Sequence, residues 1–350
     1  MKKNIFIYIL LIFSAVSCFK KAPEIFAVQK NDYAVGFSLE KKNDQWDIVS
    51  AGEKISFPVD FEVKRCIITG TSASAYIDAL GKFNTIVGVC SPNYFYNPKI
   101  PEGIKNQSIE DVGNNTFLNF EKILALKPDL IIAMHNASYE KILNQLSKTG
   151  IKVVYIEEYN ELHPLGKTEY LKLFGILFHE TQKADSLYNS VKNNYLSLKE
   201  KTNNMQKKPT VFTGIMYGDS WYMAGGKSFI STLFSDAGAD YLWTHLPETG
   251  TVSLSFEEVF SRAKTADYWI GASNFNSKKE MFNSNSHYQW FDACKNDRVY
   301  AMNGRENEQK ANDYYEAGTI YADKSLADVI KILYPNLLPD YHLTYLRKLE

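Results

Sequence analysis

The chain has 350 residues, with 39 Lys and Arg against 40 Asp and Glu, so its formal net charge is −1 and 23% of its residues are charged. This balance excludes the strongly basic surface of a nucleic-acid binder and the acidic composition of a solvating tail. The length is enough for two ordinary domains rather than one large core.

The N-terminus has the pattern of a secretory signal. Lys2 and Lys3 precede an apolar run over 5–13, and small residues follow up to Cys18. This run is too short to span a bilayer. It resembles a bacterial lipoprotein signal, in which the cysteine becomes the lipidated first residue, although Val-Ser rather than Gly or Ala precedes it. We expect 1–18 to be this signal with lipidated Cys18, and an ordinary cleaved signal is the alternative.

Strands and helices alternate after a short leading region. Residues 19–30 are typical of a linker, and alternating polarity over 31–60 predicts a peripheral β-hairpin. Over 61–164, strands are expected in VKRCIIT, TIVGVC, DLIIA and IKVVYI, and helices in SASAYIDALG, FEKILAL and SYEKILNQLSKTG. Apolar strands alternating with helices predict an α/β lobe with a parallel sheet.

A long helical pattern follows the first lobe. Apolar residues from Leu171 to Leu198 recur at spacings of three and four, with no proline among them. We expect one helix over 165–205, which is long enough to cross a small domain; Gly175 and the nearby HETQ are where it could break. Over 206–350 a second α/β lobe is expected, with strands in PTVFTGIM, DYWIGA and VYAM and helices in GKSFISTLFSDAG and SFEEVFSRAK.

Three cysteines remain besides Cys18. Cys66, Cys90 and Cys294 are an odd number, so they do not make a disulfide framework. Cys66 and Cys90 lie in predicted strands and could pair, but buried free thiols are the favoured interpretation. Their spacings match no zinc site.

Several stretches together carry a resemblance to a known family. They are, in order, IVGVC, DVGNNTFLNFEKILALKPDLIIA, WYMAGGKSFISTLFSDAGADYLW, SLSFEEVFSRAKTADYWI and NDYYEAGTIYADKSLADVIKILYP. Over roughly 60–340 the chain resembles the substrate-binding proteins of ABC importers for ferric siderophores, haem and cobalamin. The resemblance implies two Rossmann-like α/β lobes joined by one long rigid helix, a non-enzymatic role, and no permanently bound cofactor.

The resemblance also gives a role to a glutamate that follows phenylalanine in both lobes. In relatives, one surface carboxylate on each lobe meets arginines of the membrane-spanning permease, and these positions match Glu121 and Glu257. Exposed charge pairs add little energy but orient an encounter. Glu258 and Glu110 are alternative positions, and solvated charges at helix N-termini are the other interpretation.

Aromatic residues are the main candidate ligand contacts. Ligands of open α/β sheets lie against loops at the carboxyl ends of strands. By resemblance, Trp221 and Tyr222 match an aromatic wall of relatives, and Tyr94 and Tyr96 offer a wall from the opposite lobe. Aromatic faces suit a planar macrocycle or an aryl-bearing chelate, and ordinary loop packing is the alternative.

Five further residues complete the candidate set. Tyr314 and Tyr315 stand where relatives often carry an aromatic–Trp pair, and the missing Trp leaves the ligand undefined. Arg305 could form a bidentate contact with a ligand carboxylate or phosphate. Asn115 and Trp290 also fall in loops that the strand-end rule selects.

Two other classes of protein stay open. A receptor for free zinc or manganese needs three or four clustered His and carboxylate ligands, and only His135 follows a first-lobe strand. A lipoprotein hydrolase needs a nucleophile with a base, and no such motif is recognisable. The resemblance instead implies capture of a ferric siderophore, haem or cobamide, without nucleic acid. The receptor would be lipid-anchored on the periplasmic side of a Gram-negative membrane and would deliver the chelate to the permease and ATPase of an importer.

Overall fold

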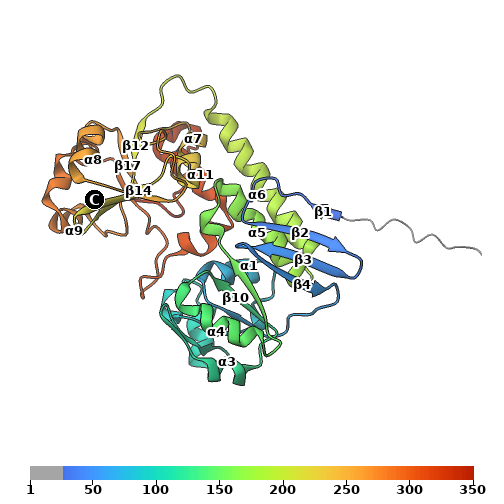
Figure 1. Cartoon of the computed structure of the whole chain (residues 1–350). Coiled ribbons are helices and arrows are strands. Elements are labelled where there is room, and N and C mark those ends of the chain that lie inside the picture. The colour runs from blue at the N-terminus through green and yellow to red at the C-terminus, as the bar shows by residue number, and fades with distance from the viewer. Residues whose placement is uncertain (1–26) are drawn as a thin grey trace, which may run out of the picture.

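The computed structural model describes residues 27–350, so the predicted signal and Cys18 lie outside the described residues. Two α/β lobes lie at either end of a pair of helices, and a small antiparallel sheet packs beside that pair (Figure 1). The two expected lobes and their helical connection are therefore confirmed.

The first lobe is built on a parallel five-stranded sheet in the order β11-β10-β5-β6-β7. Its strands are β5 (Cys66–Ile68), β6 (Ile86–Val89), β7 (Glu110–Asp111), β10 (Leu130–Met134) and β11 (Lys152–Ile156). The connections hold α1 (Thr71–Ala79), α2 (Lys99–Lys105), α3 (Phe120–Leu126), α4 (Ala137–Ser147) and the hairpin of β8 (Gly113–Asn114) and β9 (Phe117–Leu118). β5 and β6 are wholly buried because apolar clusters cover both faces of the sheet.

The second lobe has a sheet in the order β15-β12-β17-β18-β19. Its strands are β12 (Thr210–Phe212), β15 (Asp240–Tyr241), β17 (Tyr268–Ile270), β18 (Val299–Ala301) and the antiparallel edge strand β19 (Arg347–Lys348). A separate antiparallel sheet joins β13 (Ile215–Tyr217), β14 (Ser220–Ala224) and β16 (Thr251–Leu254). The helices are α7 (Phe229–Asp236), α8 (Phe256–Ala263), α9 (Lys278–Ser284), α10 (Asp292–Lys295) and α11 (Ala322–Leu333).

The connection between the lobes consists of two helices rather than one helix over 165–205. α5 (Pro164–Leu177) and α6 (Thr181–Thr202) pack against each other, and a β-carbon added at Gly175 would lie 2.6 Å from that of Ala184. His179 adopts φ 55° between them, and the N–H of Glu180 donates to the carbonyl of Gly175 at 2.8 Å. The apolar periodicity continues through this turn, which is why it predicts a single helix.

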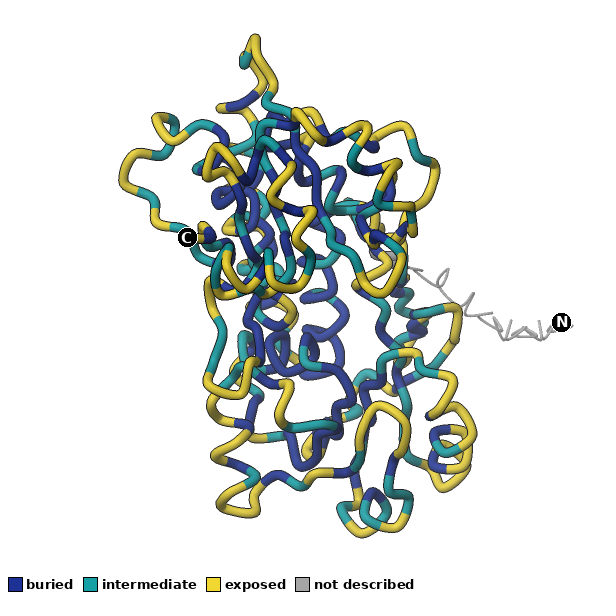
Figure 2. The backbone as a smooth tube through the Cα atoms, turned by 90° about the vertical axis from the view of Figure 1, so that its left-hand side faces the viewer, coloured by how far each residue is buried: buried dark blue, intermediate teal, exposed yellow. Residues whose placement is uncertain are grey.

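Each of these helices reaches both lobes. Leu165 on α5 and Tyr195 on α6 belong to the core of the second lobe, whereas Leu177 and Tyr188 belong to that of the first. Figure 2 shows the buried residues of this helix pair running between the two lobes. α6 is the long connecting helix that was expected, but it begins at residue 181.

The region before the first lobe is a four-stranded antiparallel sheet, not a hairpin. It comprises β1 (Ala27–Gln29), β2 (Phe37–Lys42), β3 (Gln45–Ser50) and β4 (Glu53–Pro58) in sequential order. At Ala51–Gly52 both residues have positive φ, and this tight turn reverses the chain so that β4 pairs with β3. The spacing of polar residues alone did not predict β4.

Two buried carboxylates hold this sheet against the helix pair. Glu169 on α5 accepts the backbone N–H groups of residues 32–34 at 2.8–2.9 Å, and Glu161 accepts those of Val35 and Gly36 at 2.9–3.2 Å. Hydrogen bonds to charged groups are stronger than neutral ones. These hydrogen bonds attach the loop between β1 and β2 to α5 and to the segment just before it, and β1 lies within 19–30, where a linker was expected.

The three cysteines of the described region are buried free thiols, as expected. Burial raises the pKa of each of them, and the thiol of Cys90 lies 3.2 Å from the hydroxyl of Tyr139. Across residues 27–350, no helix combines the length and apolarity needed to cross a membrane.

Candidate ligand-binding site

A cavity of about 370 Å³ opens between the lobes at the carboxyl ends of the second-lobe strands. Loops after β12, β17 and β18 contribute Gly214, Gly271 and Met302, and Tyr159 comes from the first lobe, just after β11. The remaining wall is mostly aromatic, aliphatic or hydroxyl-bearing. A concave apolar pocket with a few polar groups is the usual form of a small-molecule site.

Three of the sequence-predicted residues meet in this cavity. Tyr222 on β14 is 43% exposed, and Tyr315 is 53% exposed. Tyr314 is buried beneath them, with its ring centroid 5.3 Å from that of Tyr315 at an interplanar angle of 84°. Burial raises the pKa of Tyr314, so its hydroxyl stays protonated at neutral pH.

Trp221 does not line the cleft, contrary to expectation. It is fully buried, and its indole N–H donates to the carbonyl of Thr213 at 3.0 Å. Its ring lies 5.2 Å from that of Trp269 and 5.7 Å from that of Phe291, within the core of the second lobe. On a pleated strand, successive side chains point to opposite faces, so Trp221 faces inward where Tyr222 faces the cavity.

Three other candidates also lie away from this cavity. Trp290 is 44% exposed and packs edge-on against Phe260 of α8. Tyr94 is exposed, and Asn115 is exposed at the tip of the β8–β9 hairpin. A position just after a strand places a residue at the carboxyl end of the sheet, but it does not fix the direction of the side chain.

Arg305 and Tyr96 lie together in a second interlobe cavity of about 410 Å³. The Arg305 guanidinium donates to Asp313 at 2.7 Å and lies 5.4 Å from the Tyr96 ring centroid. Arg305 is therefore already paired with a carboxylate. The sequence predicts Arg305 and Tyr96 in the same cleft as Tyr222. The structure places them in a separate cavity, to which Tyr96 comes from the first lobe and Arg305 from the second.

Glu316 fastens the second lobe to the first at this junction. Its buried carboxylate accepts the N–H groups of Tyr96 at 2.7 Å and Asn97 at 3.1 Å, and the hydroxyl of Ser74 at 3.0 Å. Burial raises its pKa to about 7, against the opposing effect of these hydrogen bonds.

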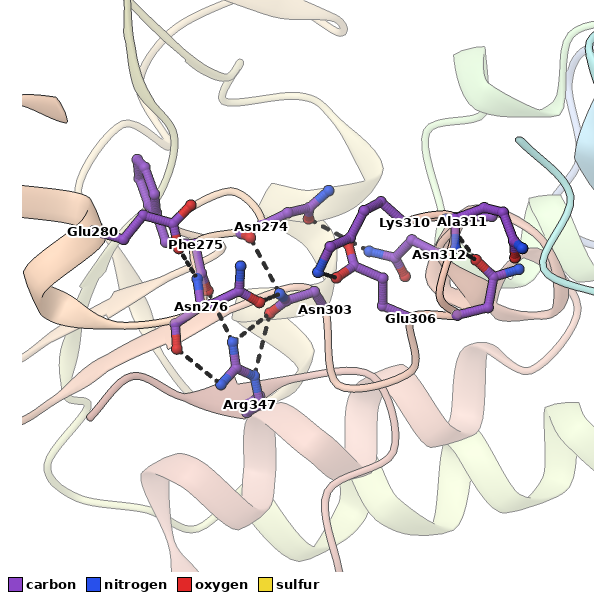
Figure 3. A network of polar contacts seen from close by, with 12 residues as sticks. Asn274, Phe275, Asn276, Glu280, Asn303, Glu306, Lys310, Ala311, Asn312 and Arg347 are labelled. Atoms are coloured by element: carbon purple, nitrogen blue, oxygen red, sulfur yellow. Dashed lines mark hydrogen bonds and ion pairs between the residues drawn. The ribbon is translucent and has the colours of Figure 1, made fainter. Parts of the chain in front are cut away.

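The segment that carries Glu316 is fixed to its own lobe by a polar network. Asn303 accepts from Arg347 at 3.2 Å (Figure 3). Asn312 donates to the carbonyl of Met302 at 2.8 Å. At its far side, Asn307 donates to the carbonyl of Phe95 in the first lobe at 3.2 Å. Residues 303–316, here called the clasp, therefore reach across the lobe junction.

Glu121 and Glu257 occupy matching positions on the two lobes. Each is exposed and is the second helical residue after a side-chain cap, at Asn119 for α3 and at Ser255 for α8. Glu258 is exposed beside Glu257, whereas Glu110 lies 3.5 Å from the ammonium of Lys122. The repeated Phe-Glu motif is thus the same capped helix start in each lobe.

His135 lies at the carboxyl end of β10 but is exposed, and its Nδ1 is 3.9 Å from Glu157. In the part of the chain that the structure describes, no group of three or more His, Cys, Asp or Glu residues is arranged to hold a metal ion.

Sequence reasoning missed several cleft residues. Tyr159, Met302 and Phe229 line the cavity; Met302 directly follows β18, and Tyr159 lies three residues after the end of β11. The strand-end rule could have found Tyr159 and Met302. Phe229 begins α7, and its position depends on how that helix packs.

Two α/β lobes with a cleft between them and a helical connection define a two-lobed binding protein of the helix-bridged class. The sequence profile of the periplasmic binding protein family matches residues 67–306. Because this match covers more than half of the chain, the chain belongs to the periplasmic binding protein family.

Curated relatives agree with this assignment. The chain is 26% identical over 311 residues to an uncharacterised lipoprotein of Methanocaldococcus jannaschii, spanning 85% of this chain and 72% of the relative. It is 25% identical to an uncharacterised ABC transporter substrate-binding lipoprotein of Bacillus subtilis, spanning 62% and 71%. A vitamin B12-binding protein of Salmonella paratyphi A is 31% identical over 146 residues, which is 42% of this chain and half of that protein.

Solved structures share the fold. A periplasmic haem-binding protein of Vibrio cholerae superposes with a TM-score of 0.61 at 20% identity, covering 78% of this chain and 100% of that one. A protein of an Fe³⁺-hydroxamate transport system from Saccharomonospora viridis gives 0.61 at 16% identity, covering 81% and 97%.

Proposed function

We propose that this protein is the substrate-binding component of an ABC importer and captures a metal chelate between its lobes. The observation that carries the proposal is the aromatic interlobe cavity formed by Tyr159, Tyr222 and Tyr315. Family membership and the relative named as an ABC transporter substrate-binding lipoprotein support the transport role.

The class of chelate is inferred from the cavity lining and from the ligands that appear in the names of related proteins and of proteins with the same fold. Exposed tyrosine faces suit a planar macrocycle or an organic chelate, and the matched proteins are named for vitamin B12, haem and Fe³⁺-hydroxamate. The ligand is therefore an iron–siderophore, haem or cobamide that is taken up and released, rather than a resident cofactor.

The location and partners complete the proposal. Lipidation at Cys18 would hold the body at the periplasmic side of a membrane, in agreement with relatives named as lipoproteins. Glu121 and Glu257 would meet cationic pockets of the permease, because each lobe presents one exposed carboxylate at the same place on a helix.

The helix pair limits how the lobes move. α5 and α6 both pack into the two cores, and the clasp adds hydrogen bonds across the junction. Ligand capture therefore involves a modest closure of the lobes and not a wide hinge.

A thermal-shift screen with haem, cyanocobalamin and ferric siderophores tests the function. Binding to the folded state adds RT ln(1 + [L]/Kd), so one of these ligands should raise Tm in a concentration-dependent way. Tyr222→Ala with Tyr315→Ala should reduce that shift, and Tyr94→Ala, at an exposed tyrosine outside the cavity, is the matched control. Failure of every chelate to stabilise the chain would overturn the proposed function.

A further inference from the structure

A small inner pocket adjoins the interlobe cavity. Its volume is about 30 Å³, and it shares five lining residues with the larger cavity, namely Thr213, Ile230, Gly271, Met302 and Tyr314. The rest of its wall is mostly apolar and comes mainly from α7, β17 and α11. A space of this size holds a water molecule or one small terminal group of a ligand. The inner pocket is therefore an extension of the cleft into the second lobe.

Two hydroxyl groups lie where the inner pocket meets the cleft. Thr213 and Tyr314 line both spaces, and only 8% and 9% of their surfaces are exposed. Neither hydroxyl forms a hydrogen bond with another group of residues 27–350, and neither oxygen is enclosed by protein. A group bound in the inner pocket can therefore reach both. Burial raises the pKa of Tyr314, so its hydroxyl stays protonated and can donate.

A glycine keeps the space beside the Thr213 hydroxyl open. Gly271 follows β17 with φ 83°, and a β-carbon at this position would lie 2.6 Å from the Thr213 oxygen. A larger residue would be strained there and would cover the hydroxyl. Ser325 on α11 is also buried and lines the inner pocket, and its hydroxyl has no partner among the described residues. Buried hydroxyls are normally paired, so these three indicate a space that an occupant with hydrogen-bonding atoms completes.

The charges around the inner pocket decide which kind of group it suits. None of the described residues that line the pocket or the larger cavity is Lys, Arg or His. Asp328 on α11 lines the pocket, and its buried carboxylate accepts the N–H groups of residues 344–346 at 2.6–2.9 Å and the hydroxyl of Tyr341 at 2.8 Å. An anionic group would find no counter-charge here and would lie beside a carboxylate, at the cost of its own desolvation. The inner pocket therefore suits an uncharged group.

Building on the proposed function, we propose that the inner pocket anchors one uncharged carbonyl-bearing group of the chelate through the hydroxyls of Thr213 and Tyr314. The Tyr314 hydroxyl donates to the carbonyl oxygen. Because a hydroxyl also accepts, Thr213 can take the N–H of a carboxamide or donate a second hydrogen bond to the same carbonyl. The body of the chelate stays in the larger cavity, against Tyr159, Tyr222 and Tyr315.

Equilibrium titration with cyanocobalamin, a neutral ferric tris-hydroxamate and haem tests the inference. The first two carry uncharged carbonyl groups, whereas the carbonyl groups of haem belong to ionised carboxylates. The native chain should bind at least one of the first two more tightly than haem. Tyr314→Phe and Thr213→Val each remove one hydroxyl and nearly keep the shape of the side chain. Each should weaken the tighter of these two probes by about threefold to tenfold, as expected for one lost hydrogen bond.

The stability of the free chain separates this role from a structural one. Because neither hydroxyl has a partner in the free chain, removing it should leave the denaturant midpoint unchanged or raise it. Tyr268→Phe makes the same change at a partly exposed tyrosine on β17, outside both spaces. This matched control should alter neither affinity nor stability.

Three results would overturn the inference. The first is native affinity in both variants, which would mean that the hydroxyls hold only ordered water. The second is a loss of affinity that always accompanies a loss of stability, and the third is tighter binding of haem or another anionic chelate than of both uncharged probes. Each of these leaves the proposed function standing if a chelate binds, whereas failure of every chelate in the thermal-shift screen would overturn both.

Discussion

At the scale of single residues, Trp221 and Tyr222 show that neighbours on one strand can have different roles, the first in the core and the second at the cavity. They are neighbours on β14, and the pleat buries the first at 0% exposure and leaves the second 43% exposed at the cavity. The sequence identifies both as aromatic residues at the right end of the lobe. Which of the two faces the ligand depends on register with β13 and β16.

Because Trp221 lies in the core and Tyr222 at the cavity, substituting the first should affect stability and substituting the second should affect ligand binding. Trp221→Phe removes the indole N–H that satisfies the Thr213 carbonyl, so the free energy of unfolding should fall by about 1–3 kcal/mol. Chelate affinity should stay close to native. Tyr222→Ala should leave stability nearly unchanged and weaken binding. Denaturant unfolding and calorimetric titration measure the two effects, and weaker binding by a fully stable Trp221→Phe would contradict this assignment.

At the scale of elements, the clasp and the helix pair decide how the lobes are held. The clasp is anchored to the second lobe through Asn303 and Asn312 and reaches the first through Glu316. Its sequence, rich in Asn and charged residues, is typical of a surface loop. Only the fold places its last carboxylate under the N–H groups of Tyr96 and Asn97.

The buried carboxylate makes the stability of this contact depend on pH. Burial raises the pKa of Glu316 from 4.5 to about 7, so the folded chain holds this proton more tightly than the unfolded chain. Its contribution is complete below about pH 4.5 and is lost as pH rises through 7. Relative to Glu316→Gln, the native chain should lose up to about 1.4 kcal/mol of unfolding free energy per pH unit between pH 5 and 7.

Denaturant unfolding of both chains at several pH values tests this expectation. The difference between them should level off above about pH 8, where the carboxyl is ionised in both folded and unfolded states. Parallel pH profiles for the two chains would show that Glu316 does not titrate in this range.

At the scale of the whole molecule, the two lobes present Glu121 and Glu257 as a matched pair of acids. Both helices begin with the same capped Phe-Glu arrangement, and each acid is exposed. Exposed charges contribute little to stability but orient a partner that carries complementary charges.

Removing both acids should therefore abolish uptake and leave the receptor intact. Glu121→Ala with Glu257→Ala is expected to keep native Tm and native chelate affinity, while transport through the cognate permease is lost. Glu258→Ala, one residue from Glu257, is the control and should transport normally. Full transport by the double variant would place the docking surface elsewhere.

The sequence by itself determined the two α/β lobes, the helical connection and the repeated capped glutamate, because these follow from local periodicity, capping and strand-end chemistry. It did not determine the turn at His179, since apolar spacing continues through it. The sequence also did not predict that Tyr222 and Tyr315 lie in one cavity while Arg305 and Tyr96 lie in another. Only the tertiary structure decided those groupings, because the direction of a side chain depends on register and packing between segments far apart in the chain.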